Sequence, residues 1–284
     1  MVDVASIVLA IVSLVGAIGA AVITGWFAFY SDYRKRLSES EKLVAKYRDP
    51  LLLAASDLQS RLFNIVDQGI LNYFDSPNRR QRDTLTIYTC FLVGQYFAWT
   101  NILRRQAQFL CFSTDKQNKQ LADILASVSH VFATDGKYGP DQPFLLWRGQ
   151  QMAIGESMTI REDNGEGKEL VCLGYAAFSK KMEDETFRQW FEPVIEGITT
   201  LFEQRGQPNG TEHRLRHLQH LLVDLISILD TKRLRAGGAN SRRCRKSPKC
   251  TCLDCKPAEP SQRPPRTRAS TRESGPRPRS SSKV

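Results

Sequence analysis

An uninterrupted apolar run near the start of the chain constrains its fold most strongly. From Val4 to Ser31 the sequence contains no Asp, Glu, Lys, Arg or His, and it consists mostly of Val, Ile, Leu, Ala and Gly. About 20 apolar residues in a helix cover the roughly 30 Å hydrocarbon layer of a bilayer. We therefore predict a transmembrane helix over residues 4–30, with an aromatic group at one membrane interface formed by Trp26, Phe27, Phe29 and Tyr30.

A cleaved secretory signal is the competing interpretation of this run. Such a signal has a positively charged start and an apolar core of about 7 to 15 residues. Met1-Val2-Asp3 contains no Lys or Arg, and the apolar run is about twice too long. We expect a retained anchor.

The flanking charges predict the orientation of this anchor. No basic residue precedes the run, whereas six follow it closely: Arg34, Lys35, Arg36, Lys42, Lys46 and Arg48. Because Lys and Arg near a span stay on the cytoplasmic side, we expect a single-pass membrane protein with its N-terminus out and its C-terminus cytoplasmic. Small residues four apart, such as Gly16 and Ala20, would also allow self-association of the transmembrane helix, although such residues are common in spans that do not associate.

The remainder up to residue 235 predicts a mainly α fold. Residues 31–48 indicate a juxtamembrane helix, and Asp49-Pro50 indicates the cap and first position of a new helix. Residues 49–235 then form a helical cytosolic domain, a bundle whose apolar residues repeat at three and four. We expect its helices over residues 50–74, 79–112, 113–133, 183–202 (kinked at Pro193) and 211–229.

The helix expected over residues 79–112 is the most apolar part of this domain. Leu85 to Leu103 contains no charge, so a second membrane span is a rival interpretation. Its Thr, Gln and Asn side chains would need partners in hydrocarbon. A central helix of the bundle is therefore the better prediction.

One β-hairpin is expected within the domain, near residues 157–178. Two runs with strand propensity flank the turn sequence DNGEG at residues 163–167.

The charge is distributed very unevenly. Residues 1–235 hold 27 Lys and Arg against 27 Asp and Glu, whereas residues 236–284 hold 13 against 3. The last 49 residues also contain 7 Pro and no aromatic residue, which predicts a disordered basic tail. The tail has no aromatic groups on which bases could stack, which disfavours nucleic acid as a partner. Contact with anionic lipid and an inert solubilising role both remain open for the tail.

Candidate site residues lie in this tail. Four cysteines there could be plain reduced thiols, acylation sites or, with a spacing unlike that of zinc knuckles, metal ligands. The odd total of 7 Cys fits a reducing compartment. Cys90, Cys111 and Cys172 fall on apolar segments and are expected as small core residues. The residues predicted for lipid contact or modification are Cys244, Cys250, Cys252, Cys255, Arg242, Arg243, Arg245 and Lys246, and those predicted for phosphorylation are Ser247 and Ser270.

Three histidines in the last expected helix have a spacing that could suit a metal. If Leu215 is heptad position a, His213 and His220 are at f and His217 is at c, opposite the apolar seam. We therefore expect all three in water, and we predict no metal site and no cofactor.

No nucleophile or phosphate-binding motif indicates an enzyme. Ser113 to Lys116 matches S-x-x-K, but it stands at a helix start, where Ser and Thr are expected as caps. The carboxylates Glu156, Glu162 and Asp163 lie near the hairpin, where surface charge is their usual role.

A family of uncharacterised, N-terminally anchored single-pass membrane proteins from fungi resembles this chain in the run from Tyr47 to Leu52 and in Ala54-Ala55, Asp57 to Leu62 and Asn64-Ile65. The resemblance covers about residues 25–230 and implies no activity, cofactor or catalytic residue.

Two functional hypotheses follow. The first is a single-pass protein whose helical module binds other proteins, as yet unknown, or organises a membrane surface, with the tail contacting anionic lipid. The alternative is a membrane-anchored enzyme with a site near the hairpin, which a pocket around Glu156, Arg161 or Trp147 would favour.

Overall fold

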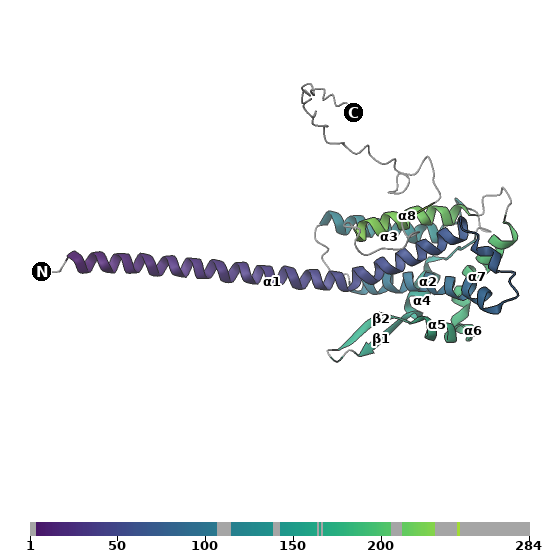
Figure 1. The fold of residues 1–284 in the computed structure, drawn as a ribbon, viewed down its shortest axis with the longest axis horizontal. Helices are drawn as coiled ribbons and strands as arrows, with labels where there is room; N and C mark the ends of the chain where they lie inside the picture. Colours follow the sequence, from purple (N-terminus) through teal and green to yellow (C-terminus); the bar gives the residue numbers. More distant parts are fainter. Residues whose placement is uncertain are drawn as a thin grey trace, which may run out of the picture.

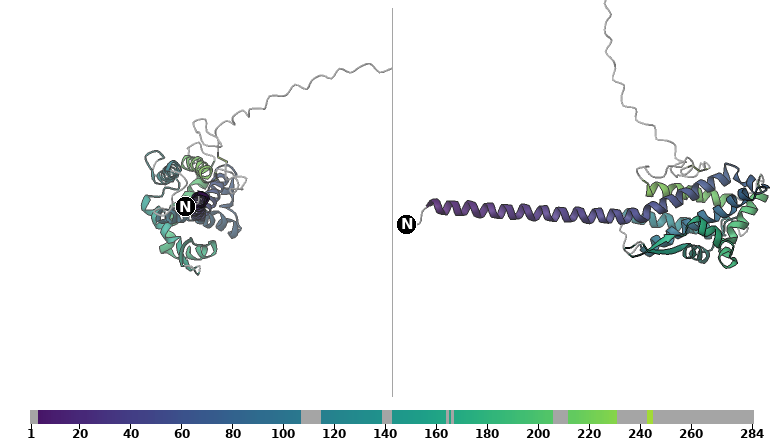
Figure 2. Two further views of the ribbon diagram at one scale, coloured as in Figure 1. Left: turned by 90° about the vertical axis from the view of Figure 1, so that its left-hand side faces the viewer. Right: turned by 60° about the horizontal axis from the view of Figure 1, so that its bottom comes forward.

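A single long helix joins the N-terminal region to the folded body in the computed structural model of the chain. The structure describes residues 4–106, 115–138, 143–163, 165, 167–205, 212–230 and 243–244; within them, the side chains of residues 4–12, 14–15, 36–45 and 115–118 are not described. Helix α1 spans Val4–Val66 without a break. Figure 1 shows its first part standing clear of the body, and the end-on view in Figure 2 places its axis over the middle of the body.

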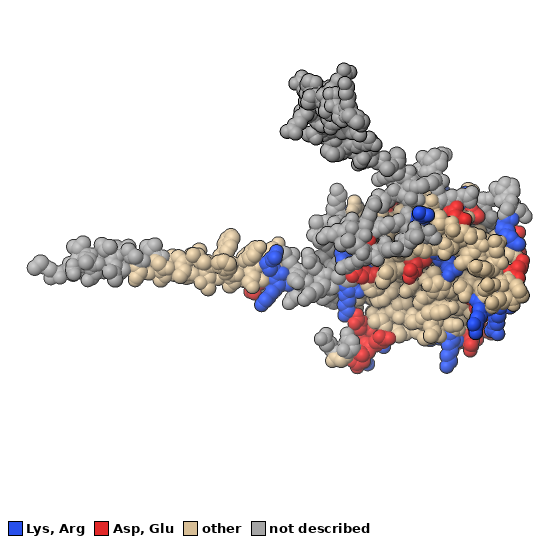
Figure 3. Space-filling model, viewed as in Figure 1, with Lys and Arg blue, Asp and Glu red and all other residues tan. Residues whose placement is uncertain are grey.

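The projecting part of α1 is exposed on every side. All residues from Gly16 to Lys35 are exposed, including large apolar ones such as Trp26 at 72% and Phe29 at 73%. Figure 3 shows the described part of this stretch in tan up to a group of blue and red side chains, and in the sequence the first charged residues after Gly16 are Asp32, Arg34 and Lys35. Among the residues whose side chains the structure describes, which leave out residues 4–12 and 14–15, no helix has an apolar stretch long enough to cross a membrane.

The prediction of two separate helices over residues 31–48 and 50–74 is wrong. Pro50 lies inside α1, and the helix continues through it to Val66. Proline removes one backbone donor and bends a helix, but it does not always end it. In Figure 1 α1 changes direction where it enters the body. A left-handed Gly69 then leads into the short 3₁₀ helix η1 (Ile70–Tyr73).

Helix α2 (Arg79–Gln106) is the central element, as predicted. It starts after Asn78, whose Oδ1 accepts a hydrogen bond from the backbone N–H of Arg80 at 3.0 Å. Its uncharged middle is buried in the core, and it packs against α1, η1, both strands and three other helices. Residues 107–112, predicted as part of this helix, lie outside the described residues.

Two further helices extend the bundle from α1. Helix α8 (His213–Leu229) packs on α1 and on α3 (Asp115–Ala133). The predicted leucine seam of α8 is confirmed, because five of its leucines are buried: Leu215, Leu218, Leu222, Leu225 and Leu229.

The hairpin is confirmed and is shorter than predicted. Strand β1 (Thr159–Asp163) pairs antiparallel with β2 (Lys168–Cys172), with Ile160 opposite Val171. The second strand ends at Cys172, and helix α5 (Tyr175–Lys181) takes the place of the strand expected up to residue 178. The aromatic ring of Phe178 in α5 packs edge-on against Phe191, so core packing outweighs local strand propensity.

The helix expected over residues 183–202 is divided. Helix α6 (Glu185–Arg188) and the 3₁₀ turn η3 (Gln189–Phe191) precede α7 (Glu192–Glu203). Pro193 stands in the first turn of α7, where its missing N–H has no helical partner to lose. The proline therefore starts a helix and does not kink one. Helix α4 (Arg148–Ser157) packs on α2 and completes a mainly helical fold with one small hairpin.

Candidate functional site

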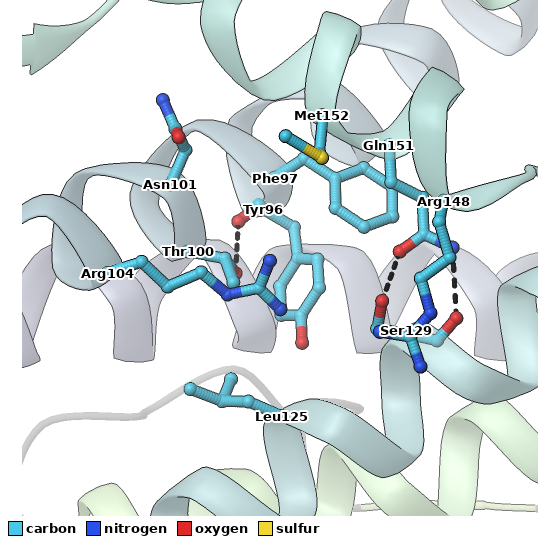
Figure 4. A pocket seen from close by; sticks show the side chains of 10 residues that line it. All are labelled: Tyr96, Phe97, Thr100, Asn101, Arg104, Leu125, Ser129, Arg148, Gln151 and Met152. Atoms are coloured by element: carbon cyan, nitrogen blue, oxygen red, sulfur yellow. Dashed lines mark hydrogen bonds between the residues drawn. The ribbon is translucent and has the colours of Figure 1, made fainter.

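A cavity of about 180 Å³ lies between α2, α3 and α4 in the body (Figure 4). Helix α2 lines it with residues from successive turns of one face, and α3 and α4 supply residues three or four apart, so each helix presents one stripe to the cavity. The lining residues are Tyr96, Phe97, Thr100, Asn101 and Arg104 of α2, Leu125 and Ser129 of α3, and Arg148, Gln151 and Met152 of α4.

A buried amide holds one wall of the cavity together. The Nε2 group of Gln151 donates to the backbone carbonyls of Ser129 at 2.9 Å and Leu146 at 2.8 Å. Its Oε1 accepts a hydrogen bond from the Ser129 hydroxyl. Because all its hydrogen-bonding groups are engaged, Gln151 fixes α4 against α3 and has no donor left for a ligand.

Two other polar groups of the lining are also satisfied within the protein. The Thr100 hydroxyl donates to the backbone carbonyl of Tyr96 at 2.8 Å. Nδ2 of Asn101 donates to the Thr159 hydroxyl at 3.3 Å, which ties α2 to the start of the hairpin.

Three polar groups of the lining have no hydrogen bond or ion pair with another described residue. The Tyr96 side chain is 1% exposed, and its hydroxyl makes no hydrogen bond within the described structure. Arg104 and Arg148 are exposed, and no carboxylate of the described residues lies within ion-pair distance of either guanidinium. The neighbouring Arg105, in contrast, pairs with Glu156 at 3.3 Å. The lining thus includes two solvent-exposed arginines that form no ion pair with a described residue, and no acidic residue.

The electrostatics of Tyr96 follow from this position. Burial raises the pKa of its hydroxyl above the ordinary value, while the positive charge of Arg104 acts in the opposite direction. The hydroxyl is therefore a neutral hydrogen-bond donor at physiological pH. In the view of Figure 4 it points between the side chains of Arg104 and Ser129.

The predicted tail site is described only at Arg243 and Cys244, which lie against the body. The carbonyl of Arg243 accepts a hydrogen bond from Nε2 of Gln59 in α1. Cys244 is 4% exposed, and its Sγ lies 3.2 Å from Nδ1 of His220 in α8. Cys244, which the sequence places in a predicted disordered tail, is therefore covered by the body. The remaining predicted residues lie outside the described part of the chain: Arg242, Arg245, Lys246, Ser247, Cys250, Cys252, Cys255 and Ser270.

The three histidines of α8 have different environments. His213 is exposed, as predicted. His217 is half-buried, its Nδ1 forms a hydrogen bond with the Tyr138 hydroxyl, and burial together with the charge of Lys137 lowers its pKa. His220 is buried at 9% exposure, which contradicts the predicted position in water. Within the described residues, no group of three or more His, Cys, Asp or Glu side chains could hold a metal ion.

The other candidate positions do not meet at one place. Glu156 is engaged with Arg105, and the Asp163 carboxylate accepts the backbone N–H of Gly165 at 3.0 Å in the hairpin turn. Glu162 is exposed on β1. Cys90 is buried and Cys172 is half-buried, as expected of small core residues. Ser113 and Cys111 lie outside the described residues.

Sequence reasoning missed the cavity because no local signal marks it. Thr100, Asn101 and Arg104 stand at the end of an apolar helix, where polar residues and a basic last turn are ordinary. Only packing brings them beside Arg148, which is 44 positions further along the chain than Arg104. Comparison of this chain with protein-family models, curated proteins and solved structures finds no match.

Proposed function

We propose that the protein is a single-pass membrane protein that holds a helical interaction module beside a cytoplasmic membrane surface. One observation carries this proposal: the apolar stretch of α1 from Gly16 to Tyr30 is exposed on all sides and makes no part of the body's core. Apolar surface of this extent is favourable only when it is removed from water, by lipid or by other apolar helices.

Two features of the stretch support a lipid environment. The hydroxyl of Thr24 donates to the backbone carbonyl of Ala20 at 2.8 Å, so that this polar side chain is satisfied within the helix, as hydrocarbon demands. The full uncharged run from Val4 to Ser31 is also long enough by sequence to span a bilayer. Exposed Arg34 and Lys35 follow it directly and support a cytoplasmic position of the body.

Extraction of membranes with alkaline carbonate tests the anchor. We expect the full chain to stay in the membrane pellet. A double variant, Ile18→Arg with Val22→Arg, should move to the supernatant, because each charge near the centre of a span costs about 2.5 to 3.5 kcal/mol on insertion scales. The matched variant Ile18→Leu with Val22→Leu should remain in the pellet. Release of the unmodified chain by carbonate would refute the anchor.

Glycosylation tests the orientation. Asn209-Gly210-Thr211 is a sequon that lies outside the described residues. In the proposed orientation it faces the cytosol and stays unmodified, so treatment with a glycosidase should not change the mobility of the protein. A glycan on Asn209 would show that this part of the chain faces the lumen, which would contradict the proposed orientation.

The tail is proposed to contact anionic lipid. Its excess of 10 positive charges would lie on the membrane side that carries anionic lipid, where each basic residue contributes about 1 kcal/mol. A peptide of residues 236–284 should sediment with vesicles that contain phosphatidylserine and not with neutral vesicles. Equal behaviour with both would leave the tail as a solubilising segment.

The alternative of a membrane-anchored enzyme has no observation in its favour. The described cavity is lined by neither Glu156, Arg161 nor Trp147, and its lining holds no Asp, Glu, His or Cys side chain that could act as a base or as an activated nucleophile. We therefore retain the interaction module as the proposed function.

A further inference from the structure

Cys244 and His220 form a buried pair in which both side chains can bind a metal ion. Sγ of Cys244 lies 3.2 Å from Nδ1 of His220, and the two residues are 4% and 9% exposed. Around a tetrahedral zinc ion, bonds of about 2.3 Å to sulfur and about 2.1 Å to nitrogen place the two ligand atoms about 3.6 Å apart. The observed separation is within a few tenths of an ångström of that value. The pair therefore has the composition and nearly the spacing of two zinc ligands.

Two helices of the body hold this part of the tail. His220 belongs to α8, and the fully buried Gln59 of α1 donates a hydrogen bond from its Nε2 group to the backbone carbonyl of Arg243, next to Cys244. The tail has few apolar residues, so burial against the body gains it little free energy. A metal bond would supply that free energy, and a structural zinc site is closed to solvent, as this pair is.

The sequence of the tail contains the thiols that would complete the coordination. Its four cysteines as a set have an unusual spacing, but two residues separate Cys252 from Cys255, which is an ordinary spacing for a pair of zinc ligands. With His220 as a ligand from the body, the tail no longer has to supply all four ligands. Arg243 and Arg245 flank Cys244 in the sequence, and basic neighbours favour the thiolate form that binds metal.

We propose that the protein binds one zinc ion through His220, Cys244, Cys252 and Cys255. Cys252 and Cys255 lie outside the described residues and are assigned from their spacing in the sequence. Each of the three thiols releases its proton to solvent when its sulfur binds zinc, and the neutral imidazole binds through Nδ1. The ion fastens the start of the tail to α8. The proposal does not depend on the membrane anchor or its orientation, since it uses only the body and the tail.

The zinc content of the full chain is the first test. The protein is purified in detergent under reducing conditions, titrated with zinc chloride and separated from unbound metal. We expect one zinc ion per chain by elemental mass spectrometry, and a dissociation constant below about 1 μM in competition with a chromogenic chelator. Failure to bind zinc after this titration would overturn the proposal.

Single substitutions identify the ligands. His220→Gln, Cys244→Ser, Cys252→Ser and Cys255→Ser should each weaken zinc binding at least about 100-fold, because the loss of a group that only supports a ligand already costs about 10- to 100-fold. Circular dichroism of each variant checks that its helices are formed. Unchanged affinity in both His220→Gln and Cys244→Ser would mean that the body takes no part in binding, which would overturn the proposal.

His213→Gln and Cys250→Ser are the matched controls. His213 is exposed on the same helix as His220, and Cys250 is a tail thiol outside the proposed set. Both variants should keep one zinc ion per chain with unchanged affinity. A loss in Cys250→Ser as large as that in Cys252→Ser would contradict the proposed ligands.

Cobalt distinguishes coordination from a structural effect of these substitutions. Co²⁺ bound by thiolates in a tetrahedral site has a near-ultraviolet charge-transfer band whose intensity follows the number of thiolates. At saturating cobalt, Cys244→Ser should lower this band by about one third, because three thiolates become two, whereas His220→Gln should leave it unchanged. An undiminished band in Cys244→Ser would show that this thiol does not bind the metal.

Discussion

At the scale of single residues, Arg214 is the largest fully buried side chain among the described residues. Its Nη1 group donates to the backbone carbonyls of Val131 at 2.6 Å and Phe132 at 3.1 Å. These carbonyls belong to the last turn of α3, where unpaired acceptors give the helix end a partial negative charge. The guanidinium also lies over the ring of Tyr138, at 5.0 Å from its centroid. Arg214 thus takes the place of a capping group and joins α8 to α3.

Removal of this side chain should destabilise the body. We expect Arg214→Ala to lower the free energy of unfolding by about 3 kcal/mol, because it removes the donor to the Val131 carbonyl and opens a cavity, while the Phe132 carbonyl keeps the backbone N–H of Leu146 as a donor at 2.9 Å. The measurement is urea-induced unfolding followed by circular dichroism.

Arg216→Ala is the control for this prediction. Arg216 is two positions away and forms an i,i+4 ion pair with Glu212 near the surface. Its loss should cost less than about 0.5 kcal/mol. Equal effects of the two substitutions would contradict the capping role of Arg214.

The buried thiol of Cys172 should make the free energy of unfolding fall as the pH rises into the alkaline range. Burial raises its pKa from 9.0 to about 12, so the folded protein keeps the thiol protonated in a range where the unfolded chain releases the proton. Stability from this group is complete below pH 9 and is lost as the pH rises towards 12, with a limiting slope of about 1.4 kcal/mol per pH unit.

Comparison with Cys172→Ala isolates this contribution. Other groups titrate over the same range, but they are common to both proteins. Between pH 8 and 11 the unmodified protein should lose about 2 kcal/mol more than the variant, measured as the difference between their urea unfolding free energies. Parallel pH profiles would show that the thiol does not carry the effect.

At the scale of elements, the contact between α2 and α4 depends on a glycine. A Cβ atom at Gly155 would lie 2.9 Å from the carbonyl oxygen of Phe97 and 3.1 Å from Cβ of Asn101. The carbonyl oxygen of Phe97 belongs to the backbone of α2, so it cannot move aside as the end of a side chain can. Gly155→Ala should therefore separate the two helices and destabilise the protein by about 1 to 3 kcal/mol.

Gly149, in the same helix, is a glycine that an alanine can replace without a clash. A Cβ atom at Gly149, also in α4, would meet no neighbouring atom within 4 Å, so Gly149→Ala should be neutral or stabilise by up to about 1 kcal/mol. Thermal unfolding of the two variants should move in opposite directions. A loss of stability in both would mean that α4 tolerates no added side chain for a reason other than the contact with α2.

Elements with a strong repeated pattern were predictable from sequence. Helix α2 and the seam of α8 each present a long apolar face, and the two strands of the hairpin flank a glycine-containing turn. The proline signals at Pro50 and Pro193 were ambiguous. Proline is tolerated both at a helix start and, with a bend, within a helix, and tertiary packing decides between them.

The prediction that His220 is exposed to water was wrong for a related reason. The heptad argument gave α8 one buried seam, whereas α8 packs on both α1 and α3 and also contacts Cys244. Its buried arc is therefore wider than a two-residue seam. The cavity residues escaped prediction because three helices must pack before they meet.

At the scale of the whole molecule, α1 belongs both to the projecting segment and to the core. Leu51, Leu58 and Leu62 in its second half are fully buried, and this half packs against α2 and α8. The residues from Gly16 to Lys35 are exposed and contribute nothing to that core. The proposed anchor and the body are thus parts of one helix with separable roles.

This division predicts that the body folds without the anchor. Deletion of residues 1–31 should shift the midpoint of thermal unfolding by less than about 2 °C, because no core contact is lost, and the protein should no longer need detergent. Leu58→Ala in the deleted chain is the matched comparison. It removes a fully buried side chain from the other half of α1 at a cost of about 3 kcal/mol, which corresponds to a fall of roughly 10 °C for a domain of this size. If deletion of residues 1–31 alone lowered the midpoint as far as Leu58→Ala does, the apolar stretch would be packing on the body, and an anchor exposed to lipid would be excluded.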